Sequence, residues 1–118
     1  MSLDEIVDKY RKSLLLDSWD IYLKEDESVY GDEGQSAEID INVVYKNAFM
    51  TLYKSAFDGS APVEQVILHE MCHIVTDPLF ICATDLSAGH LRTQADLYNQ
   101  REMVTEHLAK IMREAVKR

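Results

Sequence analysis

The sequence predicts an α+β fold in a single domain spanning residues 1–118. Helical apolar periodicity appears near both ends of the chain, and alternation of apolar and polar residues fills much of the stretch between residues 18 and 55. A further, strongly apolar helical pattern follows Pro62. These patterns predict an N-terminal helix, a small and mainly antiparallel sheet of about three strands, a middle helix and a long C-terminal helix. The hydrophobic content of 47% is sufficient for one core.

The first helix is expected over Leu3–Leu16. Its apolar face carries Leu3, Ile6, Val7, Tyr10 and Leu14 at helical spacing. Ser2, with Glu5 three residues later, matches the capping-box pattern, in which side chains satisfy free backbone N–H groups at the start of a helix. This helix is expected to serve packing alone.

Three segments alternate apolar and polar residues as half-buried strands do: Ser18–Lys24, Ala37–Tyr45 and Ala48–Ser55. The acidic segment Glu25–Gln35 contains two glycines and is expected to be a loop or a wide connection. Lys46-Asn47 is expected to form a tight turn, because asparagine tolerates positive φ. The last two strands are therefore expected to pair as a hairpin.

The middle helix is expected to follow a turn over Phe57–Ala61, with Ser60 as its N-cap and Pro62 in its first turn. Its predicted end is Thr76. Asp77-Pro78 comes next, and proline disfavours the helical conformation at the residue before it. The helix would then cover a single strongly apolar stretch of the chain.

A loop over Leu79–Arg92, bordering a site, and a long helix over Thr93–Val116 complete the predicted fold. The main apolar stripe of that last helix is Leu97, Val104, Leu108, Ile111 and Ala115. Glu102 and Glu106 lie nearly opposite this stripe. Two interpretations follow: the helix is sandwiched between the core and the middle helix, or the two glutamates face solvent.

The middle helix contains the run His69-Glu70-Met71-Cys72-His73. Residues four apart lie on one helix face, with about 5–6 Å between their Cβ atoms. His69 and His73 can therefore direct two imidazoles at one metal ion, and Glu70 lies close enough to act on a molecule bound there. This is the His-Glu-x-x-His arrangement of zinc-dependent hydrolases, and it predicts a Zn²⁺ site. The alternative is a buried structural pair of histidines.

A catalytic zinc takes three protein ligands and keeps its fourth position for water. The metzincin pattern would place a third histidine six residues after His73, where this chain has Leu79. Glu102 and Glu106 are better candidates, because one can bind the metal while the other holds a ligand histidine in its tautomer. The fallback ligands are Asp77, Asp85, His90 and His107.

The net charge of −9, from 12 basic and 21 acidic residues, argues against binding to nucleic acid or to an anionic membrane surface. No apolar run reaches the ~20 residues of a membrane span, and the start of the chain lacks the pattern of a secretory signal. Cys72 and Cys82 are expected to be reduced. The chain is therefore expected to be cytoplasmic, and its oligomeric state is left open.

The motif, taken with Glu102-x-x-x-Glu106, resembles the gluzincin arrangement, in which a glutamate on a following helix is the third ligand. The run His73-x-x-x-Asp77-Pro78 resembles small phage- and prophage-encoded metallopeptidases and, more distantly, those that regulate mobile-element repressors. The resemblance covers roughly residues 60–112 and implies a minimal zincin-like core, with Glu102 as the third ligand and Glu106 supporting the site. It also implies that an edge strand within residues 46–55 binds an extended peptide or protein substrate by β-augmentation.

These features predict a zinc-dependent peptidase in which Glu70 is the general base that takes a proton from a metal-activated water. The candidate donors to the oxyanion are Tyr98, His90 and Arg92. The alternative is a catalytically silent metal-binding or protein-interaction module that keeps the zincin fold, and a third hypothesis is a purely structural helix pair. Glu70 favours the enzyme, because it is not a ligand and has little structural reason to be there.

Overall fold

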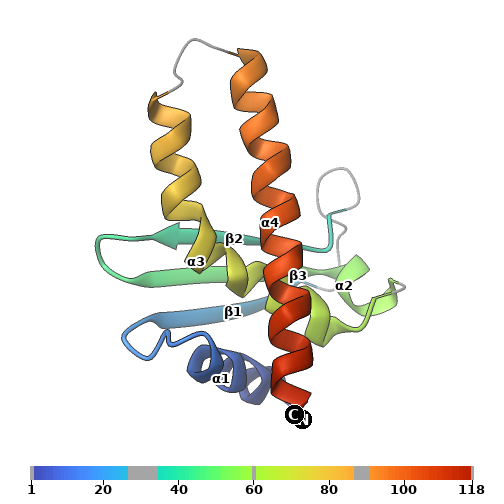
Figure 1. Cartoon of the computed structure of the whole chain (residues 1–118). Coiled ribbons are helices and arrows are strands. Elements are labelled where there is room, and N and C mark those ends of the chain that lie inside the picture. Colours follow the sequence, from blue (N-terminus) through green and yellow to red (C-terminus); the bar gives the residue numbers. More distant parts are fainter. Residues whose placement is uncertain (1, 27–34, 60, 87–90, 118) are drawn as a thin grey trace.

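The computed structural model describes residues 2–26, 35–59, 61–86 and 91–117 of the chain. Its elements, in chain order, are α1 (Leu3–Ser13), β1 (Asp20–Asp26), β2 (Ala37–Asn42), β3 (Asn47–Tyr53), α2 (Lys54–Asp58), α3 (Val63–Leu86) and α4 (Leu91–Lys117). The predicted α+β layout is confirmed: an N-terminal helix, a three-stranded sheet and two long helices (Figure 1). The segment 27–34, Ser60 and the segment 87–90 lie outside the described residues, and with them most of the predicted acidic loop, the predicted N-cap and His90.

The three strands form one sheet in the order β1-β3-β2, so β3 is the central strand. β2 and β3 form the predicted antiparallel hairpin, with Ile39 opposite Met50. β1 runs parallel to β3, with Leu23 opposite Met50, and the sheet is therefore mixed. On the central strand, alternate side chains point to the core, and the buried ones are Ala48, Met50 and Leu52.

The turn of the hairpin occupies residues 43–46, because β2 ends at Asn42 rather than at Tyr45. The Asn42 side-chain oxygen accepts a hydrogen bond from the Tyr45 backbone N–H at 3.1 Å, which replaces strand pairing with a local turn. Positive φ falls on Lys46, at 53°, and Asn47 already belongs to β3. The predicted turn is thus displaced toward the N-terminus.

The core lies where α1 and α3 pack together against the sheet, and α4 packs along α3. Figure 1 shows α3 and α4 side by side, extending beyond the sheet. The predicted cap of α1 is present, since the Ser2 hydroxyl oxygen accepts the Glu5 backbone N–H at 3.2 Å. The largest fully buried side chains are Tyr10, Met50, Leu52, Ile67, Leu68, Met71, Thr105 and Cys72.

α3 continues through Pro78 to Leu86, so the predicted end at Thr76 and the predicted loop from Leu79 are wrong. Proline inside a helix removes one backbone donor, and its ring crowds the carbonyl group one turn back, which costs about 3 kcal/mol and disturbs the turns around it. Here those turns are held by side chains: Asp77 binds His73 one turn back, and the Thr76 hydroxyl lies 2.8 Å from that of Thr105 on α4. The contacts with α4 therefore outweigh the local preference of Asp77-Pro78 for ending the helix.

Two further differences concern local structure. Lys54–Asp58 forms the short helix α2, with Ala56 buried, where the pattern predicts the end of a strand and a turn. The span Val63–Ala83 of α3 is long and apolar enough to cross a membrane. Helices in the cores of globular proteins meet the same criterion, so this property does not assign a location.

The buried face of α4 is not the one that its predicted apolar stripe indicates. Val104 and Ile111 of that stripe are 45% and 51% exposed, whereas Thr105 and Ala109 are 0% and 4% exposed. The glutamate side of the helix therefore faces α3, as the sandwich interpretation requires. The part of that interpretation that placed the whole apolar stripe on the core is wrong.

Candidate metal centre

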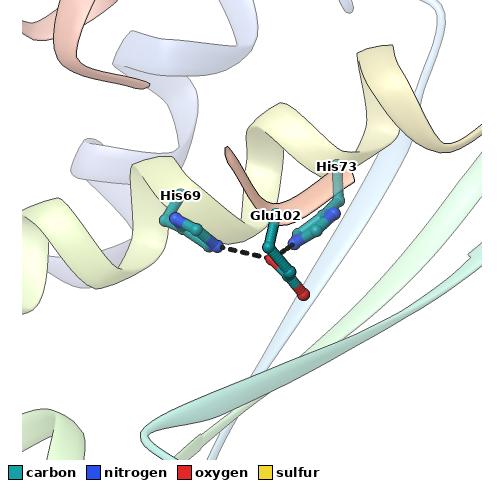
Figure 2. Close-up of side chains that lie close together, drawn as sticks. All are labelled: His69, His73 and Glu102. Carbon is teal, nitrogen blue, oxygen red and sulfur yellow. Dashed lines mark hydrogen bonds and ion pairs between the residues drawn. The ribbon is translucent and has the colours of Figure 1, made fainter. Parts of the chain in front are cut away.

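α3 brings two imidazoles together on one face, one helical turn apart. The rings of His69 and His73 have centroids 5.1 Å apart and planes inclined at 72°. His73 is buried, and the His69 side chain is 23% exposed. Figure 2 shows both rings directed toward the same carboxylate on α4, so the predicted pair forms one cluster.

Glu102 of α4 supplies the carboxylate that completes the cluster. Its Oε2 lies 3.4 Å from Nε2 of His69 and 3.3 Å from Nε2 of His73 (Figure 2). Two ligands bound to zinc at about 2.0–2.1 Å in a tetrahedron lie about 3.3–3.4 Å from each other. The two nitrogen–oxygen distances therefore match the edges of a tetrahedral site, and they are longer than those of strong hydrogen bonds. Among the described residues, His69, His73 and Glu102 form the one cluster with this geometry.

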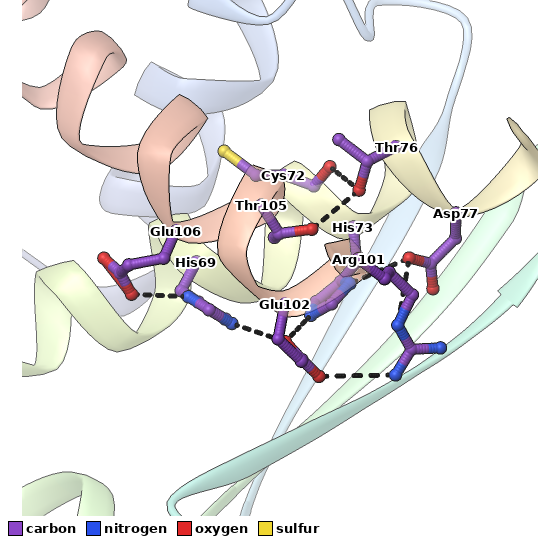
Figure 3. A network of polar contacts seen from close by, with 9 residues as sticks. All are labelled: His69, Cys72, His73, Thr76, Asp77, Arg101, Glu102, Thr105 and Glu106. Carbon is purple, nitrogen blue, oxygen red and sulfur yellow. Dashed lines mark hydrogen bonds and ion pairs between the residues drawn. The ribbon is translucent and has the colours of Figure 1, made fainter. Parts of the chain in front are cut away.

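The other nitrogen of each ring faces a carboxylate. Nδ1 of His69 lies 2.8 Å from Oε2 of Glu106, and Nδ1 of His73 lies 2.8 Å from Oδ1 of Asp77 (Figure 3). A carboxylate can only accept, so a proton on each Nδ1 would leave the lone pair of Nε2 free for a metal. Glu106 thus occupies the supporting position predicted for it, and Asp77, a fallback ligand by sequence, supports His73 instead.

His73 also shows the electrostatic character of the cluster. Burial lowers the pKa of His73, but the hydrogen bond and charge of Asp77, with the charges of Glu70 and Glu102, outweigh burial and raise it above its ordinary value. Four carboxylates thus surround two imidazoles in a partly buried site. Such a site favours a cation, which these groups can neutralise and coordinate.

Glu70 lies beside the cluster and lines a recess on each side of it. Burial raises the pKa of Glu70 to about 7, against the lowering effect of His73 and His69 and with further raising by Glu102 and Asp77. A carboxyl group with a pKa near neutrality can both accept and return a proton. This is the property that a general base at a hydrolytic site requires.

The two recesses, of about 450 and 290 Å³, share Gln35, Glu70, Tyr98 and Glu102. Ala37 of β2 lines the larger one, and Ile39 of β2 lines the smaller one. β2 is an edge strand of the sheet, whereas Asn47–Tyr53 is the central strand and has a neighbour on both sides. The edge strand beside the site is therefore β2 and not a strand within residues 46–55.

Of the other fallback ligands, His107 is the one whose side chain the structure describes. His107 is exposed on α4, and the side chains of Asp85, His90 and Arg92 lie outside the described part of the structure. Both cysteines are free, as predicted. Cys72 is fully buried, and burial, with a contribution from Glu106, raises the pKa of its thiol to about 12, so it is not a nucleophile.

Sequence reasoning did not identify Arg101, which contacts both Glu102 and Asp77 at the site. It also gave Asp77 the role of a ligand. The available signal was the four-residue spacing of His73 and Asp77, which places them on one face once the helix continues past Pro78. Comparison of the chain with family models, with curated proteins and with solved structures finds no match.

Proposed function

We propose that this chain is a zinc-dependent peptidase whose metal is held by His69, His73 and Glu102. The observation that carries the proposal is the position of Glu102 Oε2, at tetrahedral-edge distances from both Nε2 atoms. Two imidazoles and one carboxylate suit zinc and leave one coordination position for water. Bound zinc supplies Lewis acidity and lowers the pKa of a bound water to near 7.

Glu70 is the general base in this proposal. Its position beside the ligands and its pKa of about 7 suit it to take a proton from water during attack on a peptide carbonyl and to pass that proton to the leaving amine. Tyr98 lines both recesses, and its hydroxyl is the candidate donor to the oxyanion. Glu106 and Asp77 each face the Nδ1 atom of a ligand histidine and would orient its ring with Nε2 toward the metal.

An extended peptide is the proposed substrate. β2 lines the site, and among the described strands its outer edge is unpaired, so its backbone N–H and C=O groups can pair with a further strand. Ala37 and Ile39 of β2 line the two recesses on either side of the ligands. Because successive side chains of an extended strand point to opposite faces, a peptide on this edge would place alternate side chains in the two recesses and its backbone near Glu70.

The first experiment measures metal content. Purified protein should carry close to one zinc ion per chain, and His69→Ala should lose it. The matched control is His107→Ala, which removes an exposed histidine from α4. If His69→Ala retained as much zinc as His107→Ala, the metal site would be wrong.

A second variant separates the peptidase from a silent metal-binding module that keeps the same fold. Glu70→Gln should retain zinc, because Glu70 is not a ligand, and should lose hydrolysis of a peptide library by at least a factor of about 100, within the range of general-base contributions. Equal hydrolysis by Glu70→Gln and wild type would exclude Glu70 as the base. Stoichiometric zinc without hydrolysis in the wild type would favour the silent module.

A further inference from the structure

Arg101 closes a ring of polar contacts around one side of the cluster. Its Nη2 donates to Oε1 of Glu102 at 3.3 Å, and its Nε lies 3.9 Å from Oδ1 of Asp77. Asp77 binds Nδ1 of His73, and Nε2 of His73 faces Oε2 of Glu102. Figure 3 shows Arg101 between the two carboxylates, so this one cation connects the candidate ligand Glu102 with the group that orients His73.

The guanidinium is held from a third side as well. Its central carbon lies 4.7 Å from the centroid of the Tyr98 ring, a stacking distance for a cation on an aromatic face. Arg101 Nε is buried and has no hydrogen-bond partner. An unsatisfied buried donor is uncommon, and Arg113 Nε is the other one among the described residues. The guanidinium is therefore fixed in place although one of its own donors remains unsatisfied.

The contact with Glu102 involves only one carboxylate oxygen. Oε2 faces the two imidazoles, and Oε1 faces Arg101. A carboxylate can bind a metal through one oxygen or through both. Binding through both would occupy the position that a hydrolytic zinc site keeps for water.

We infer that Arg101 is a positioning residue that holds Oε1 of Glu102 away from the metal, so that Glu102 binds through Oε2 alone and one coordination position stays open. This inference rests on the proposed metal centre and assigns that centre its coordination number. Arg101 is the one lysine or arginine among the described residues that line the two recesses. No other cationic side chain lining them is available to hold Oε1.

A different role for Arg101 would be to bind a carboxylate of the substrate. The contacts of Arg101 favour positioning, because Glu102 and Asp77 already lie against the guanidinium from two directions and Tyr98 lies against its face. A substrate carboxylate would compete with both acidic residues. The two roles predict different effects on the metal in the absence of substrate, and this difference allows a test.

The test compares Arg101→Gln with Lys110→Gln, which removes an exposed cation from the same helix. Two quantities are measured without substrate: the zinc affinity, by competition with a chromophoric chelator, and the visible absorption of protein loaded with Co²⁺. Arg101→Gln should lower zinc affinity by about 10–100-fold, the usual effect of losing an outer partner of a ligand. It should also weaken the Co²⁺ absorption, because five-coordinate Co²⁺ absorbs less than the tetrahedral ion. Lys110→Gln should change neither quantity.

The possible failures are distinguishable. If wild-type protein binds neither Zn²⁺ nor Co²⁺, the proposed metal centre is wrong, and so is the role of Arg101. If wild type binds metal and Arg101→Gln gives the same affinity and spectrum, only the positioning role is overturned. An unchanged spectrum with weaker peptide binding would assign Arg101 to the substrate instead. If Arg101→Gln does not fold, Arg101→Met serves in its place. Methionine keeps an unbranched side chain but has no donor for Oε1, so a spectrum identical to wild type would again overturn the inference.

Discussion

The helices α1 and α4 are both amphipathic by sequence, but only α1 buries the apolar stripe that its sequence predicts. In α1 the apolar stripe reaches the core, and Ile6, Val7 and Tyr10 are all buried. In α4 the buried positions include Thr105 and Ala109, while much of the apolar stripe is exposed. An apolar stripe therefore predicts the buried face of a helix only when its neighbour presents an apolar surface.

The neighbour of α4 is the face of α3 that carries the histidines. Polar pairs connect the two helices along this face: His69 with Glu106, His73 with Glu102, and Thr76 with Thr105. Each buried polar group needs a partner, and burying an unpaired one costs about 1–3 kcal/mol. The free energy gained by giving the polar groups of these three pairs a partner thus outweighs the free energy that burying Val104 and Ile111 would gain. The geometry of the cluster and the orientation of α4 therefore have the same physical origin.

The largest expected effect comes from placing a charge on each face of α4. Ala109→Asp buries a carboxylate in a position that is 4% exposed and should lower the free energy of unfolding by about 3 kcal/mol. Ile111→Asp is the matched control, because its position is 51% exposed, and it should cost about 0.5 kcal/mol. Urea denaturation of both variants measures the difference. Equal losses, or a larger loss for Ile111→Asp, would show that the apolar stripe is the buried face after all.

The next effect concerns the polar contact at the edge of the buried stripe of α1. Tyr10 donates its hydroxyl hydrogen to Oε1 of Glu64 on α3 at 2.5 Å, and Lys9 lies 2.9 Å from the same oxygen. Tyr10→Phe keeps the ring and removes the bond. It should cost about 1.5 kcal/mol at neutral pH, the typical value for a hydrogen bond to a charged group.

The same contact makes stability depend on pH. Burial, followed by the hydrogen bond and charge of Glu64, raises the pKa of Tyr10 above its ordinary range. Its stabilising effect is fully present below the unfolded-state pKa of about 10. Above that pH the unfolded chain binds fewer protons than the native one, so the free energy of unfolding falls as pH rises. The difference between wild type and Tyr10→Phe should therefore shrink as the pH rises above about 10, and a difference independent of pH would contradict the assignment.

The sequence was sufficient for elements whose signal is local. The capping residues and stripe of α1, the alternation of β2 and the spacing of His69 and His73 each predict a structure without reference to distant residues. The site could be predicted as far as both histidines and the adjacent Glu70. The two glutamates of α4 were candidate partners by spacing alone, and their distances to the imidazoles required the packing of two helices.

The differences arise where distant contacts decide the outcome. α3 continues through Pro78, and the turn just before that proline contacts α4 through His73, Thr76 and Asp77. β1 pairs in parallel with β3 of the β2-β3 hairpin, and no local pattern specifies this direction. Arg101 gave no sequence signal, since an arginine on a surface helix usually faces solvent. Its role becomes visible only when Asp77 and Glu102 are brought to either side of it.

The smallest predicted effect tests the polar match between α3 and α4 directly. The hydroxyls of Thr76 and Thr105 lie 2.8 Å apart, and Thr105 is fully buried. Thr105→Val preserves the shape of the side chain and should cost about 1 kcal/mol. The Thr76 hydroxyl retains the Cys72 carbonyl oxygen, at 3.3 Å, as an acceptor, which limits the loss.

A double-mutant cycle separates this bond from the effects of the two substitutions. Thr76→Val, Thr105→Val and the double variant should give a coupling energy of about 0.5–1 kcal/mol, because the second substitution removes a bond that the first has already broken. Additive losses would show that the two hydroxyls do not interact.

Since Thr105 lies three residues after Glu102 on the same helix, the bond also fixes the rotation of α4 that directs Glu102 at the histidines. Zinc affinity should therefore fall in both single variants by similar factors, although neither residue contacts the metal position.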